Sequence, residues 1–71
     1  MKTIEAIKKI IAIYNNDLIT IPHEKFEKLE TWASEAGYIL EMNEENKLVL
    51  KETSKLTAMF TCIKRRMNYQ N

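Results

Sequence analysis

The segment IEAIKKIIAIY, residues 4–14, sets the strongest constraint on the rest of the chain. In a helix of 3.6 residues per turn its apolar residues fall on one broad side, and Glu5, Lys8 and Lys9 occupy the other. The apolar sector covers roughly half of the circumference, wider than the ~100° stripe of an ordinary surface helix. Such a helix needs cover from more than one direction, from the remaining segments or from a second copy of the chain.

The length of 71 residues predicts one small domain over 1–71. The single cysteine cannot form an intrachain disulfide, which favours a reducing, cytoplasmic location. Charges interrupt the first apolar run and no run is long enough to span a bilayer, so we expect no secretory leader and no membrane partner. The many Lys, Asn and Ile residues are typical of AT-rich genomes, including those of phages and mobile elements.

The first helix is expected over about 3–14, with 15–17 ending it. Residues 18–21 are mostly β-branched and precede a proline, which predicts an extended segment and a candidate minor strand. Pro22 then opens a second helix that stops at Gly37. Its predicted buried stripe is Pro22, Phe26, Leu29, Ala33 and Ala36, with Trp32 on the edge. Its predicted outward residues are Glu24, Glu27, Thr31 and Ser34.

Residues 38–42 and 47–51 predict a β-hairpin around the turn 43–46. A register that pairs Met42 with Lys47 gives two mixed faces. A register that pairs Asn43 with Lys47, with a left-handed residue at the last turn position, gives one apolar face. We favour this second register, which is expected to pair Leu40 with Leu50, Met42 with Leu48 and Glu41 with Lys51.

Thr53 or Ser54 is expected to cap a third helix. Apolar residues recur along it at i, i+3, i+4, i+7 and i+11, which predicts a single core-facing stripe. These residues are Leu56, Met59, Phe60, Ile63 and Met67. The predicted fold class is α+β: helix, short extended segment, helix, β-hairpin and C-terminal helix (αβαββα or ααββα), with a small antiparallel sheet packed on helices. One hairpin cannot cover both apolar helix faces, so we expect a homodimer.

The net charge of +1 hides a separation of charge along the chain. Residues 24–45 contain seven glutamates against two lysines, a net charge of −5, whereas residues 47–71 carry six cations against one glutamate, a net charge of +5. Such asymmetry bears on the choice of partner and on the rate of association.

Nothing in the sequence predicts an enzyme, a cofactor, a metal site or a small-molecule substrate. Cys62 is the one thiol and His23 the one imidazole, and they lie on different predicted helices. A cysteine nucleophile needs a nearby base, and a metal site needs several ligands at suitable spacing. Cys62 is better explained as a small apolar residue that fills space beside the third helix.

The acidic segment leads to the main functional hypothesis, a small regulator or inhibitor that binds a basic, nucleic-acid-handling protein. Its carboxylates would imitate phosphates, and Trp32 would serve as an apolar anchor. The alternative is that acidic and basic parts neutralise each other within one molecule or across a dimer. The predicted partner-binding residues are Glu24, Glu27, Trp32, Glu44 and Glu45.

A second hypothesis concerns DNA. The helix that ends at Gly37-Tyr38-Ile39, followed by a hairpin and a helix, resembles the end of a winged-helix domain. That resemblance implies a transcriptional regulator, and Lys64, Arg65 and Arg66 are the candidate phosphate contacts. However, the helix and hairpin that would enter the grooves carry the charge of −5, whereas DNA affinity depends on neutralising phosphates. Nucleic acid is therefore the less favoured partner.

Overall fold

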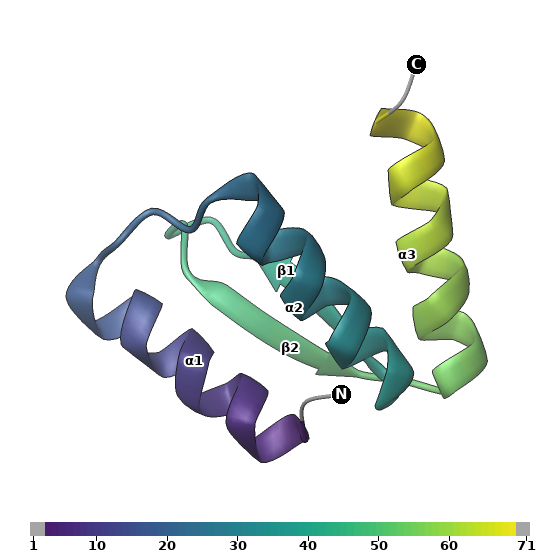
Figure 1. The fold of residues 1–71 in the computed structure, drawn as a ribbon, viewed down its shortest axis with the longest axis horizontal. Helices are drawn as coiled ribbons and strands as arrows, with labels where there is room; N and C mark the ends of the chain where they lie inside the picture. Colours follow the sequence, from purple (N-terminus) through teal and green to yellow (C-terminus); the bar gives the residue numbers. More distant parts are fainter. Residues whose placement is uncertain (1–2, 70–71) are drawn as a thin grey trace.

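The computed structural model describes residues 3–69 as three helices and one hairpin (Figure 1). The order of elements is α1 Ile4–Asp17, α2 His23–Glu35, β1 Tyr38–Met42, β2 Leu48–Glu52 and α3 Lys55–Tyr69. The strands form a two-stranded antiparallel sheet. The fold is therefore α+β in the order ααββα, and residues 18–21 form no strand.

Helix α1 begins where Thr3 Oγ1 accepts a hydrogen bond from the Ala6 N–H at 3.2 Å. It continues to Asp17, past the end predicted at Tyr14, and closes on Leu18, which adopts the left-handed conformation with φ 54°. The predicted end was wrong because asparagine disfavours a helix interior only weakly, and Asn15 has a tertiary partner. Only Ile7 and Ile11 of the broad apolar sector are buried.

Helix α2 begins directly after Pro22. Gly37, with a positive φ of +86°, completes the short connection from α2 to β1. A methyl group at Gly37 would lie 3.0 Å from the Thr53 carbonyl oxygen, so both conformation and space favour glycine there. Leu29 and Ala33 are buried as predicted. The prediction was wrong at the two ends of the stripe, because Pro22 and Ala36 are exposed.

The outward side predicted for α2 was also wrong in part. Ser34 is buried, and the Thr31 hydroxyl accepts a hydrogen bond from Arg66 of α3. Glu27 likewise forms an ion pair with Arg66. This side of α2 is covered because α3 packs against it (Figure 1).

The hairpin has the favoured register. Leu40 lies opposite Leu50, and Met42 lies opposite Leu48. The turn closes with Asn46 left-handed at φ 62°, as predicted. The expected pair of Glu41 with Lys51 was wrong: Glu41 faces Val49, and Lys51 faces Ile39, two pairs further from the turn.

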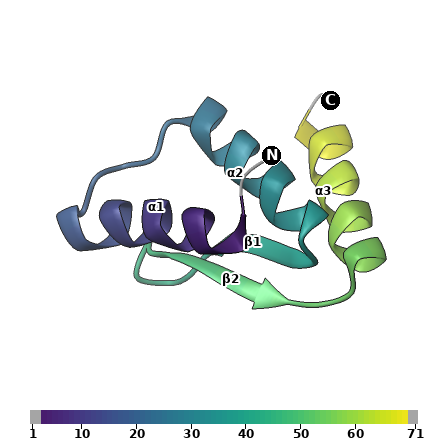
Figure 2. The same ribbon diagram turned by 60° about the horizontal axis from the view of Figure 1, so that its bottom comes forward.

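Figure 2 shows α1 and α2 on the same side of the sheet. Their apolar residues and the inner face of the hairpin form one core. The buried members of this core are Ile7, Ile11, Ile21, Leu29, Ala33, Leu40 and Leu48. Phe26, Trp32 and Tyr38 pack against it at its edges and are partly buried.

Helix α3 lies at one end of this assembly, against α2 and β1 (Figures 1 and 2). Ser54 caps it, since its Oγ accepts the Thr57 N–H at 3.1 Å. The predicted core-facing stripe was wrong. Ala58 and Cys62 are the buried residues of α3, and the apolar stripe points away from the core.

Candidate interaction surface

We name the outward apolar residues of α3 the α3 stripe: Leu56, Met59, Phe60, Ile63 and Met67. Each of these side chains is between 40% and 67% exposed. They share one side of the helix because their spacing follows the helical period. Large apolar side chains gathered on one exposed face commonly mark a site of protein association.

The opposite side of α3 explains this orientation. Ala58 is 1% exposed and Cys62 6%, so small residues allow α3 to approach α2 closely. On the same side Arg65 donates from Nη1 to Glu30 Oε2 at 2.9 Å and to the Leu40 carbonyl oxygen at 2.7 Å. The helix is therefore attached by small side chains and charged hydrogen bonds, and the α3 stripe is left uncovered.

Glu30 is the site residue that the sequence analysis missed. Its side chain is buried, and it accepts hydrogen bonds from Arg65 and, at 3.7 Å, from the Cys62 thiol. Its position gave a signal: Glu30 follows Phe26 by four residues and precedes Ala33 by three, so it lies inside the buried stripe of α2. A carboxylate at such a position requires a cationic partner.

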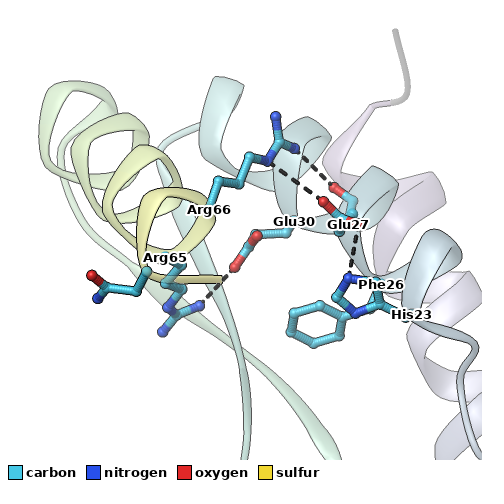
Figure 3. A pocket seen from close by; sticks show the side chains of 7 residues that line it. His23, Phe26, Glu27, Glu30, Arg65 and Arg66 are labelled. Atoms are coloured by element: carbon cyan, nitrogen blue, oxygen red, sulfur yellow. Dashed lines mark hydrogen bonds and ion pairs between the residues drawn. The ribbon is translucent and has the colours of Figure 1, made fainter. Parts of the chain in front are cut away.

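A hollow of about 300 Å³ lies between the first turns of α2 and the end of α3 (Figure 3). Polar contacts lie within it and across it. His23 Nε2 lies 3.0 Å from Glu27 Oε1 on the same helix, whereas the ion pairs of Arg66 Nε with Glu27 Oε2, at 3.9 Å, and of Arg65 with Glu30 join α3 to α2. The hollow is lined by His23, Phe26, Glu27, Glu30, Arg65, Arg66 and Asn68. The charged groups of this hollow bind one another, so its contacts hold α3 against α2.

The predicted partner-binding residues fall into two separate places. Glu24, Glu27 and Trp32 line a shallow hollow of about 400 Å³ on α2, but Lys28 and Arg66 line it as well. The surface there is therefore mixed in charge. Trp32 packs half-buried on the edge of the core.

Glu44 and Glu45 lie in the exposed hairpin turn. Glu45 Oε2 lies 3.9 Å from Lys47 Nζ. Glu45 and Lys47 line a different hollow, of about 430 Å³, which shares no residue with the one on α2.

The predicted phosphate contacts are also divided. Arg65 is bound to Glu30 and to Glu41, whose Oε1 lies 3.4 Å from Arg65 Nη2. Arg66 is bound to Glu27. Lys64 is exposed and has no ion pair among residues 3–69. Two of the three cations thus turn toward carboxylates of the same chain.

Cys62 lacks the properties of a nucleophile. Burial raises the pKa of its thiol, and the neighbouring Glu30 carboxylate raises it further. Activation of a cysteine requires a lowered pKa. Within the part of the chain that the structure describes, no group of three or more His, Cys, Asp or Glu side chains could hold a metal ion.

Comparison with protein-family models, curated proteins and solved structures gives no match for this chain. Among the helices in residues 3–69, none has both the length and the apolar character needed to cross a membrane.

Proposed function

We propose that this chain is a non-enzymatic, cytoplasmic protein-binding module that forms a homodimer and regulates or inhibits another protein. The observation that carries the proposal is the α3 stripe. Five large apolar side chains occupy the outward side of a helix whose inward side is already packed. Water exposure of so much apolar surface is unfavourable, and a bound protein chain would remove it.

The test asks whether the α3 stripe is an exposed binding surface or part of the core of the folded monomer. At low protein concentration, Leu56→Ser and Phe60→Ser should change the free energy of unfolding by less than about 0.5 kcal/mol, because both side chains are exposed. Leu29→Ala, at a fully buried position, should lose about 2–5 kcal/mol. Urea denaturation followed by circular dichroism measures both. A loss of several kcal/mol in Phe60→Ser would place the stripe inside the folded monomer and end the proposal.

The regulated target is proposed to be a basic protein, contacted through Glu24, Glu27, Glu44, Glu45 and Trp32. The support is the net charge of −5 over residues 24–45 and the exposure of Glu24, Glu44 and Glu45. Charge complementarity of this kind weakens as salt rises. Reversal of Glu24, Glu44 and Glu45 to lysine should therefore weaken binding to an immobilised basic protein such as a histone. Unchanged binding would count against an acidic docking face.

DNA binding through Lys64, Arg65 and Arg66 is the competing proposal. It would require Arg65 to leave the buried Glu30, which is unfavourable because a lone buried carboxylate remains. A gel-shift assay with duplex DNA at low salt tests it directly. Retardation that disappears in Lys64→Ala would favour DNA over a protein partner.

A further inference from the structure

Four of the five residues of the α3 stripe have a spacing that reads the same in both directions. Leu56, Phe60, Ile63 and Met67 are separated by four, three and four residues. Reversal of the helix about the midpoint between Thr61 and Cys62 therefore superposes Leu56 on Met67 and Phe60 on Ile63. This spacing suits a two-fold interface between antiparallel helices, in which residue i of one copy meets residue j of the other and residue j meets residue i.

Resting on the proposed function, we infer that the occupant of the α3 stripe is the α3 stripe of a second copy, packed antiparallel about a two-fold axis that crosses the stripe between Phe60 and Ile63. Leu56 packs on Met67 of the other copy at both ends of the interface. Phe60 packs beside Ile63 of the other copy on both sides of the axis. The aromatic ring and the branched side chain thus form the centre, and the flexible methionines close the ends.

The size of the surface sets the strength of this dimer. Residues 56–67 span about 17 Å along the helix, at about 1.5 Å per residue. Five side chains on one helix bury less than the ~800 Å² per partner of a standard stable interface. The dimer therefore belongs to the small, weak and transient class of protein interfaces.

The charges beside the stripe give the dimer a signature in salt. Helix α3 contains no acidic residue. By the helical period Lys64 lies on one flank of the stripe and Lys55 on the other, beside Arg66, which is already paired with Glu27. A two-fold antiparallel pair brings each flank against the same flank of the other copy, so cations face cations. Salt screens this repulsion and also favours apolar burial. Dimerisation therefore strengthens as salt rises, whereas an acidic partner would bind more weakly.

Sedimentation equilibrium of the full chain tests the inference. The wild-type chain should show a monomer–dimer equilibrium that tightens from low to high sodium chloride. Phe60→Ser should weaken it at least tenfold. The matched control is Ile13→Ser, which removes an apolar side chain 57% exposed on α1 and should leave dimerisation unchanged.

Cysteine cross-linking tests the orientation. Leu56→Cys mixed with Met67→Cys should form a disulfide-linked pair under mild oxidation, and Leu56→Cys alone should not. Cys62 can stay in place because it is buried. Cross-linking of Leu56→Cys with itself would overturn the antiparallel arrangement.

A chain that stays monomeric at high concentration in both salts, or that loses its dimer equally in Ile13→Ser, overturns the inference. The proposed function is judged separately, by the stability of the serine variants at low concentration. A monomer whose serine variants keep their stability would retain a binding surface for an unlike partner. Serine variants that unfold would end both.

Discussion

The side-chain amide of Asn15 occupies the place of a neighbouring strand beside Leu48. Asn15 Nδ2 donates to the Leu48 carbonyl oxygen at 2.9 Å, and the Leu48 N–H donates to Asn15 Oδ1 at 2.8 Å. The Asn43 N–H donates to the Lys47 carbonyl oxygen at 2.9 Å next to the turn, so the backbone groups of the following residue, Leu48, point to the outer edge of β2. One residue of α1 thus satisfies both polar groups of a strand edge.

Replacement of Asn15 by leucine should lower the free energy of unfolding by about 1–3 kcal/mol, because both backbone groups of Leu48 lose their partner in a partly buried position. The control is Asn16→Leu, which makes the same change of helix propensity at an exposed position. Asn15→Asp keeps the acceptor and removes the donor, so it should also destabilise. Urea denaturation measures all three. Equal stability of Asn15→Leu and Asn16→Leu would mean that the amide bonds give no net stabilisation.

Removing one partner of the Arg65–Glu30 ion pair should destabilise the fold more than replacing both partners with apolar residues. Arg65→Met should lower stability by about 2–4 kcal/mol, because Glu30 is 5% exposed and would lose its cation. The double variant Glu30→Met/Arg65→Met should be more stable than Arg65→Met alone. Lys64→Met, on the exposed neighbouring position, should change stability by less than about 0.5 kcal/mol. A double variant less stable than Arg65→Met would contradict this account.

The hairpin could be predicted from the sequence because local rules decide it. Only one register puts Leu40 opposite Leu50, and that same register requires a left-handed residue at the last turn position, which Asn46 accepts. The ends of α2 followed equally from Pro22 and Gly37. The end of α1 was misjudged because the partner of Asn15 lies 33 residues away.

The orientation of α3 could not be predicted for a physical reason. Periodicity shows which residues share one side of a helix, but it does not show which side meets the rest of the protein. The usual assumption is that the apolar side of a helix packs against the rest of the protein. Here Ala58 and Cys62 permit close approach, and Arg65 finds a buried carboxylate 35 residues earlier in the chain. The missed Glu30 and the exposed α3 stripe thus have a single cause.

Cys62 should make stability depend on pH in the alkaline range. Burial and Glu30 raise the pKa of the Cys62 thiol above its ordinary value of 9.0, so the unfolded chain loses this proton first as pH rises. The contribution is fully present below pH 9 and is lost above it, by at most about 1.4 kcal/mol per pH unit. In reducing buffer, the stability of the wild-type chain should fall more steeply from pH 9 to pH 10.5 than that of Cys62→Ala. Equal slopes would contradict the raised pKa.

Replacement of Leu18 by glycine should stabilise the fold. Its left-handed backbone, with φ 54°, costs a residue with a side chain about 1–2 kcal/mol, and its side chain is 80% exposed. Glycine removes this penalty but adds about 0.5–1 kcal/mol of unfolded-state entropy, so Leu18→Gly should stabilise the fold by up to about 1 kcal/mol. Leu18→Ala keeps the strained backbone, so its unfolding temperature and its free energy of unfolding in urea should be lower than those of Leu18→Gly. If Leu18→Gly is instead the less stable of the two, the flexibility that glycine adds to the unfolded chain outweighs the relief at this position.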